Sequence, residues 1–204
     1  MSTTTSSAGT TGTTATLSTR DRILEAASAL FYAQGIRAVS ADKIIERAGI
    51  TKVTFYRHFH TKDDLVVAYL ERQAARERAA LDGVREAADT DAEALREFAE
   101  QIGAASCRPG FRGCAFINTA AEYADPESAV RGVVAEHRAW YRSSFAEMLD
   151  HMGATDVEDA ADEVLMLRDG AMVAGYLGEA SRVGKTLAAA IFAVAAANGA
   201  SISG

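Results

Sequence analysis

The chain has 204 residues, of which 49% are hydrophobic and 24% are charged, and its net charge at pH 7 is −7. This length and composition are those of an ordinary globular protein with a sizeable core. The two cysteines, Cys107 and Cys114, exclude a disulfide framework and do not have metal-ligand spacing. We therefore expect neither a metal nor a cofactor.

The sequence predicts a cytoplasmic protein that makes no membrane contact. No apolar run precedes the first basic residue, Arg20, as a secretion signal would require. The apolar stretch from Leu187 to Ala197 is shorter than the roughly 20 residues that span a bilayer. We interpret this stretch as a buried interface helix.

Positive charge is concentrated near the amino terminus. Between Ser18 and Lys62, eight cations stand against four anions, a net charge of +4 that leaves −11 for the rest of the chain. A basic head on an acidic body is expected when one domain meets nucleic-acid phosphates and the other does not.

Helical spacing of apolar residues dominates the chain. Residues 1–17 are rich in Ser, Thr, Gly and Ala, and we expect them to form a disordered tail. Beyond the tail, apolar side chains recur every three or four residues, which predicts an all-α fold. We expect about nine helices in an amino-terminal domain (18–65) and a larger helical bundle (66–204). The predicted helices cover about residues 18–34, 40–48, 51–59, 62–88, 92–105, 113–123, 126–152, 157–183 and 186–198.

Residues 40–59 have the pattern of a helix-turn-helix. Two short helices cross steeply only where the turn has a residue that tolerates positive φ beside a small side chain, and Gly49 and Ala48 provide both. If Phe55 and Phe59 point into the core, the rotation of 100° per residue points four neighbouring residues of the same helix outward. The second helix then presents one face to the major groove of a duplex. The outward-facing residues are Val53, Thr54, Tyr56 and Arg57.

Residues 19–70 resemble the amino-terminal domain of the TetR family of transcriptional regulators. The motifs that carry the resemblance are Ile23-Leu-Glu-Ala-Ala, Leu30-Phe, Gly35, Ala48-Gly-Ile-Thr, Phe55-Tyr-Arg-His-Phe and Lys62-Asp-Asp-Leu. The resemblance implies a sequence-specific repressor that binds a palindromic operator on double-stranded DNA as a homodimer. It also implies control by a small-molecule effector, which the sequence does not identify.

The resemblance further implies which residues contact DNA. Those that would face bases are Lys52, Val53 and Thr54. Those that would hold phosphates are Ser40, Tyr56, His58 and Lys62. Thr51 and Arg57 are also predicted DNA contacts. Many family members have glycine where this chain has Val53, whose bulk prevents the closest backbone approach but offers a methyl contact to thymine. A solvated helix face is the alternative interpretation of Tyr56 and Arg57, and His58 could instead pack against the following helix.

The carboxy-terminal part is predicted to pair two copies and to hold the effector. Apolar faces at 157–198 suit the dimer interface at which family members pair, and Gly170, Gly175 and Gly178 would let helices approach closely. Apolar and aromatic side chains with a few polar tips could line a ligand pocket, although the same residues could be ordinary core. The predicted ligand contacts are Phe98, Ile102, Phe116, Tyr123, His137, Trp140, Tyr141, Met166 and Tyr176.

Three other functions compete with this interpretation. One, a purely architectural DNA-binding protein, is disfavoured because about 140 residues beyond the DNA-binding part would then have no role. Cys107 stands beside Arg108 and, with Cys114, could form a redox switch, although Cys114 is better explained as a small buried residue at a helix start. Glu122, Glu136 and His137 could form an acid/base set, but no nucleophile motif, phosphate loop or metal constellation accompanies them. We therefore expect no enzyme and no catalytic residue.

Overall fold

The computed structural model describes residues 17–178 and 180–201, and within those ranges every regular element is a helix. This confirms the all-α prediction. The predicted disordered tail, apart from Leu17, lies outside the described residues. The helices are α1 (Thr19–Gln34), α2 (Ala41–Ala48), α3 (Lys52–His58), α4 (Lys62–Ala87), α5 (Asp91–Ser106), α6 (Ala115–Glu122), α7 (Ala129–His151), α8 (Val157–Leu177) and α9 (Ala180–Ala197).

The break between the last two helices lies earlier than the sequence predicts. The apolar pattern places it near residues 184–185, but α8 ends at Leu177 because Gly178 adopts a left-handed conformation with φ of 119°. Gly184 instead lies inside α9, where it packs against a neighbouring helix. Helix α7 also begins later than predicted, because Ser128 rather than Pro126 caps it.

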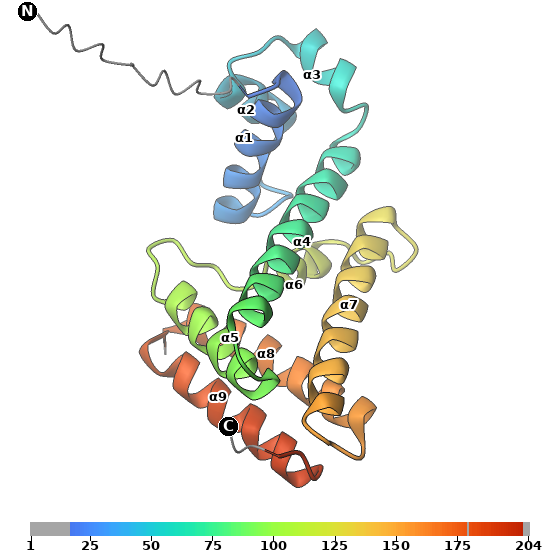
Figure 1. The fold of residues 1–204 in the computed structure, drawn as a ribbon. Helices are drawn as coiled ribbons and strands as arrows, with labels where there is room; N and C mark the ends of the chain where they lie inside the picture. The colour runs from blue at the N-terminus through green and yellow to red at the C-terminus, as the bar shows by residue number, and fades with distance from the viewer. Residues whose placement is uncertain (1–16, 179, 202–204) are drawn as a thin grey trace, which may run out of the picture.

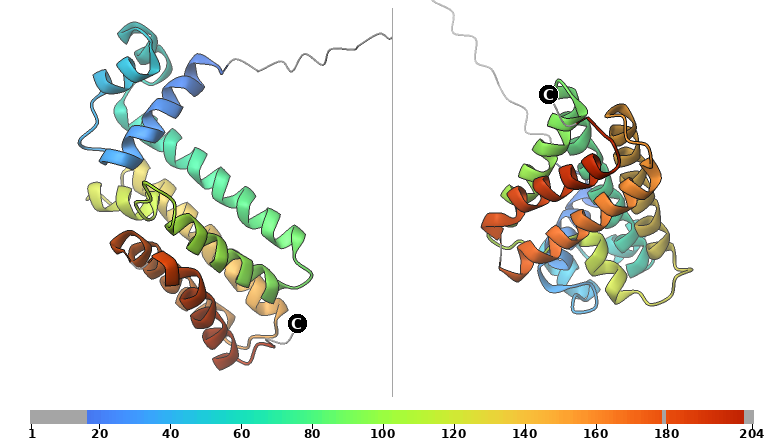
Figure 2. Two further views of the ribbon diagram at one scale, coloured as in Figure 1. Left: turned by 90° about the vertical axis from the view of Figure 1, so that its left-hand side faces the viewer. Right: turned by 90° about the horizontal axis from the view of Figure 1, so that it is seen from below.

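Helices α1–α3 form one end of the molecule and helices α5–α9 form the other (Figures 1 and 2). Helix α4 belongs to both ends, because its 26 residues run from the small domain into the larger bundle. In the bundle, α9 packs along α5 and α8, and α7 packs on α4 and α8. The buried apolar residues form two cores, which are joined through α4.

The starts of the first four helices are fixed by side-chain caps. The hydroxyl oxygens of Ser18, Ser40, Thr51 and Thr61 each accept a hydrogen bond from the backbone amide three residues on. Asp64 completes a capping box with Thr61. Such caps contribute about 1 kcal/mol each, and they hold the short helices of the small domain at defined starting points.

Helices α5 and α9 approach closely at two glycines. A Cβ atom placed on Gly103 would lie 2.8 Å from the backbone nitrogen and Cα of Gly184. Real Cβ atoms do not come so near to backbone, so Gly103 does not tolerate a side chain without movement of a helix.

Gly103→Ala should therefore lower the free energy of unfolding by about 1–3 kcal/mol, the usual effect of overpacking. Urea titration followed by circular dichroism measures the change.

Gly83→Ala is the matched control. Gly83 is exposed inside α4, and apart from its chain neighbours and its own helix backbone no atom lies within 4 Å of the position that a Cβ would occupy there. Alanine at this site should stabilise the chain by about 1 kcal/mol through helix propensity. Equal effects at the two positions would contradict the close packing of α5 on α9.

Candidate nucleic-acid interface and ligand cavity

The turn between α2 and α3 has the geometry that the sequence predicts. Gly49 adopts φ of 63° and ψ of 46°, a left-handed conformation that lets the chain reverse between the two helices. Arg22 of α1 donates from Nη2 to the carbonyl oxygen of Ala48 over 2.6 Å. The turn is therefore held in place by the first helix.

Helix α3 is fixed by its aromatic residues and exposed on its other side. Phe55 and Phe59 are buried, with their ring centroids 6.4 Å apart. Val53, by contrast, is 79% exposed and Tyr56 is 41% exposed. Of the nine predicted contacts, the exposed ones are Ser40, Thr51, Lys52, Val53, Tyr56 and Arg57, and the partly exposed ones are Thr54, His58 and Lys62.

Two of the predicted contacts are also helix caps. The hydroxyl oxygens of Ser40 and Thr51 accept hydrogen bonds from the backbone amides of Lys43 and Thr54. The hydroxyl proton of Ser40 is then left to donate outward, as a phosphate oxygen requires. One residue thus starts a helix and offers a donor at the same surface.

Several of the cations that make the small domain basic also serve the fold. Lys62 donates from Nζ to the carbonyl oxygen of Ile36 over 2.6 Å, and burial lowers the pKa of its ammonium group. Lys43 likewise donates from Nζ to the carbonyl oxygen of Ala38 over 3.1 Å. The sequence does not distinguish such lysines from Lys52, whose side chain is 67% exposed.

Helix α6 attaches the small domain to the bundle through backbone groups. The carboxylate of Glu122 accepts hydrogen bonds from the amides of Ile36 and Arg37, over 2.9 and 2.6 Å. The guanidinium of Arg37 donates back to the carbonyl oxygen of Glu122 over 2.8 Å. Glu122 therefore holds the loop between α1 and α2 in place.

The loop before α6 makes a second attachment. The hydroxyl of Tyr32 donates to the carbonyl oxygen of Gly113 over 3.0 Å and accepts from the amide of Arg112 over 2.9 Å. Beyond α6, the hydroxyl of Tyr123 donates to Asp63 of α4 over 2.7 Å. Burial and this hydrogen bond raise the pKa of the Tyr123 phenol, which keeps its proton in place. The sequence predicts Tyr123 as a ligand contact, but its hydroxyl makes a contact between the two ends of the molecule.

A cavity of about 490 Å³ opens between α4, α5, α7, α8 and the loop before α6. This volume lies in the usual range for small-molecule sites. Three of the predicted ligand contacts, Phe98, Ile102 and Tyr141, line it. The polar residues in its wall are Gln73, Arg76, Glu77, Gln101, Arg108 and Arg168, together with the hydroxyls of Tyr32 and Tyr141.

The other predicted ligand contacts do not line this cavity. Phe116 and His137 line a separate cavity of about 240 Å³ behind it. Met166 is 63% exposed and lines a groove between α8 and α9, and Tyr176 is also exposed on α8. Trp140 stacks on His137 with ring centroids 5.5 Å apart. Aromatic residues at helical spacing therefore divide among cavity, core and surface, which their spacing alone does not reveal.

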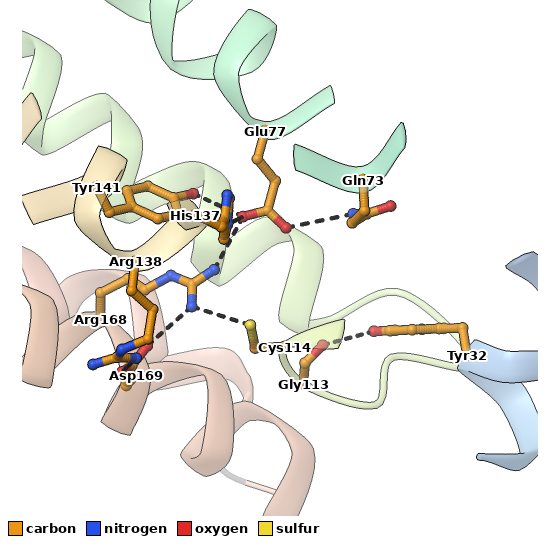
Figure 3. Close-up of polar contacts among 10 residues, drawn as sticks. All are labelled: Tyr32, Gln73, Glu77, Gly113, Cys114, His137, Arg138, Tyr141, Arg168 and Asp169. Carbon is orange, nitrogen blue, oxygen red and sulfur yellow. Dashed lines mark hydrogen bonds and ion pairs between the residues drawn. The ribbon is translucent and has the colours of Figure 1, made fainter. Parts of the chain in front are cut away.

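Glu77, His137 and Arg168 form a buried polar layer at the inner end of the cavity (Figure 3). Glu77 Oε2 accepts hydrogen bonds from His137 Nε2 and the Tyr141 hydroxyl, both over 3.0 Å, and from Arg168 Nη2 over 3.2 Å. Burial raises the pKa of Glu77, but the hydrogen bond from His137 and the charge of Arg168 outweigh burial, so the pKa is lowered. The carboxylate is therefore charged near neutral pH.

Glu77 and Arg168 are not among the residues predicted from the sequence. Each is a charged side chain in an otherwise apolar stripe, Glu77 between Ala74 and Leu81, and Arg168 three residues after Leu165. A charge that interrupts an apolar stripe is the sequence feature by which these two residues could have been found. It does not say which charges pair, because the two residues are 91 positions apart.

The two cysteines are free thiols in different surroundings. Cys114 is buried at the start of α6, as predicted, and Arg168 Nη1 donates to its sulfur over 3.2 Å. Cys107 is exposed at the end of α5. The redox switch thus stays a prediction, which mild peroxide followed by a DNA-binding measurement would test.

Sequence comparison identifies the small domain. The profile described as bacterial regulatory proteins, tetR family, matches residues 23–69. The chain is 38% identical over 71 residues to the transcriptional activator FasR of Mycolicibacterium smegmatis, and 42% identical over 53 residues to the transcriptional regulator TtgR of Pseudomonas putida. These matches cover 35% and 26% of this chain, but only 31% and 25% of the two curated relatives.

Structural comparison extends the similarity to the whole bundle. A crystal structure of SCO4454, a TetR-family transcriptional regulator from Streptomyces coelicolor, superposes with a TM-score of 0.84 and 38% sequence identity. The match covers 88% of this chain and 95% of that one. These relatives are transcriptional regulators and not enzymes, as expected. The chain therefore belongs to the TetR family of transcriptional regulators, and its amino-terminal helix-turn-helix is a DNA-binding domain.

Proposed function

We propose that the protein is a dimeric repressor that binds a palindromic operator and is controlled by a small molecule held in the cavity of about 490 Å³. The observation that carries this proposal is the exposed face of α3 at one end of the molecule and an exposed apolar face of α8, beside the open side of α9, at the other (Figure 2). A single recognition helix reads few base pairs, and pairing two copies doubles the contacts.

The apolar stripe on α8 supports pairing with a second copy. Met166, Val173 and Leu177 lie on one helix face and are 63%, 46% and 76% exposed. Gly170, between them, has open space beside it. A groove of about 440 Å³ follows this face along α9. Exposed apolar surface of this kind is typical of interfaces between subunits.

The same interface explains why helix α9 is apolar but little buried in one copy. Ala180–Ala197 is long and apolar enough to cross a membrane by length and composition alone, and only 22% of it is buried in one copy. It nevertheless contains Arg182 and Lys185, and its buried residues Leu187 and Ile191 pack into the bundle core. We assign its open side to the partner subunit and place the protein in the cytoplasm, where bacterial DNA lies.

On the DNA side, we assign base contacts to Lys52, Val53 and Thr54 at the amino end of α3. Ser40, Tyr56 and His58 are assigned to phosphates, with Thr51 and Arg57 beside them. The support is their exposure around one helix whose opposite face is anchored by two phenylalanines. Lys62 is the weakest of the nine contacts, because its ammonium group already binds a carbonyl oxygen.

Ligand control would act through the loop before α6. Gly113 lines the cavity, and its carbonyl oxygen accepts the Tyr32 hydrogen bond from α1. Glu122, at the other end of α6, holds the amides of Ile36 and Arg37. A ligand that displaces this loop would move the small domain relative to the bundle. A spacing of recognition helices that fits the operator poorly would then be favoured, and the repressor would be released.

Lys52→Ala should weaken binding to an operator selected from a random DNA pool by about 1–3 kcal/mol, because a base contact is lost. Binding to random duplex should fall much less. Fluorescence anisotropy at several salt concentrations measures both, and Arg96→Ala, at an exposed position on α5, removes the same charge far from α3 as a control. Equal losses on the two DNAs would argue against a base contact.

Met166→Glu should convert the dimer into a monomer, because symmetry places the two introduced carboxylates in one apolar interface. Sedimentation measures the oligomeric state of the variant.

In cells, a reporter whose promoter overlaps the selected operator should be repressed by the original chain and released by the Met166→Glu variant. Ala135→Glu, on the exposed side of α7, is the control. A dimeric, repressing Met166→Glu variant would overturn the assigned interface, and reporter activation by the original chain would overturn the repressor assignment.

Glu122→Ala should expose the amides of Ile36 and Arg37 to solvent, because their acceptor is removed. Hydrogen exchange at these two amides should then become much faster, while amides in the bundle core remain protected. Glu127→Ala, at an exposed neighbouring site, should leave them unchanged. Unaltered exchange after Glu122→Ala would show that this carboxylate does not hold the two ends together.

A further inference from the structure

The inner end of the cavity offers an acceptor that the protein itself leaves largely unused. Three donors converge on Glu77 Oε2, whereas Oε1 has one contact, from Gln73 Nε2 at 3.5 Å. That distance is at the outer limit of a hydrogen bond. The Glu77 side chain is only 19% exposed, so water reaches it poorly. A buried carboxylate oxygen with spare lone pairs favours an occupant that donates a hydrogen bond.

The charges around Glu77 disfavour a cationic occupant. Arg168 pairs with both Glu77 and Asp169, and Arg138 also pairs with Asp169. Two arginines, Arg138 and Arg168, thus balance the two carboxylates of Glu77 and Asp169 (Figure 3). A neutral donor such as a hydroxyl meets Oε1 without adding charge to a buried site.

The walls and the mouth define the rest of the occupant. Phe98 and Phe111 line the sides of the cavity, as do the rings of Tyr32 and Tyr141, which suits a flat aromatic body. At the mouth, Arg76 and Arg108 are exposed and have no ion pair among the described residues. These two cations suit an acidic group at the outer end.

We propose that the cavity takes a hydroxylated aromatic acid, with its hydroxyl donating to Glu77 and its acidic group facing Arg76 and Arg108. This inference rests on the proposed function, because it names the chemical class of the effector. Glu77 is then the residue that selects for a hydrogen-bond donor at one end of the ligand. Arg76 and Arg108 bind the acidic group at the other end.

Calorimetry with three matched compounds tests the proposal on the full chain without DNA. 6-Hydroxy-2-naphthoate has both groups, 6-methoxy-2-naphthoate lacks the donor and 2-naphthol lacks the acid. Loss of a hydrogen bond to a charged group should weaken binding about tenfold or more for the methoxy compound. Loss of the acid should weaken it about two- to fivefold, because the arginines are exposed, and this part should decline with salt.

Glu77→Gln should reduce the preference for the hydroxyl to about threefold or less, because a neutral amide is a weaker acceptor. Glu71→Gln, at an exposed position on the same helix, should keep the full preference. If Glu77→Gln does not fold, the comparison of the three compounds on the original chain still decides. Equal binding of the hydroxy and methoxy compounds, or tightest binding of 2-naphthol, would overturn the proposal.

The outcome separates this inference from ligand control itself. If 6-hydroxy-2-naphthoate binds with the expected preference but leaves operator affinity unchanged, the cavity assignment stands and control through α6 fails. If the chain shows no preference among the three compounds but other small molecules release it from the operator, ligand control stands and the chemical class is wrong.

Discussion

One buried polar layer between two apolar cores holds the main helices of this molecule in register. On α4, the first core ends at Ala74 and the second begins at Leu81, with Glu77 between them. On α7, His137 lies between Val134 and Tyr141 in the same way. Charges at this depth are tolerated only when they are paired, and removing one partner typically costs about 3–5 kcal/mol. The layer therefore aligns α4, α7 and α8, all three of which line the cavity.

The connection between the two ends of the molecule is made of directional contacts. Glu122 binds two backbone amides of the α1–α2 loop, and Tyr32 bridges α1 to the loop before α6. Hydrogen bonds of this kind specify an orientation, whereas apolar packing alone tolerates sliding. The small domain is consequently held at a defined angle, and the loop that holds it forms part of the cavity wall. The cavity is thus linked to α1 through Gly113 and Tyr32.

Charge and apolar surface are divided between the two ends of the chain. The segment from Ser18 to Lys62 carries a net charge of +4 and the remainder −11, so DNA is attracted to one end and repelled from the other. Lys43 and Lys62 also bind carbonyl oxygens of the small domain, so its positive charge has a structural use as well. The exposed apolar face of α8 lies at the acidic end, away from α3. The proposed pairing of two copies there would leave both copies of α3 free.

Features that depend on neighbours within a few positions follow from the amino-acid sequence alone. Caps such as Ser40, the left-handed turn at Gly49 and the inward face of Phe55 and Phe59 arise from local backbone and side-chain preferences, and they specify the helix-turn-helix. Long-range packing decides which charges pair and which aromatic residues reach the cavity. It also decides that Gly184 lies against α5 inside a helix. Such outcomes depend on contacts like that between Glu77 and Arg168, 91 residues apart, and separations of that length leave no local pattern in a sequence.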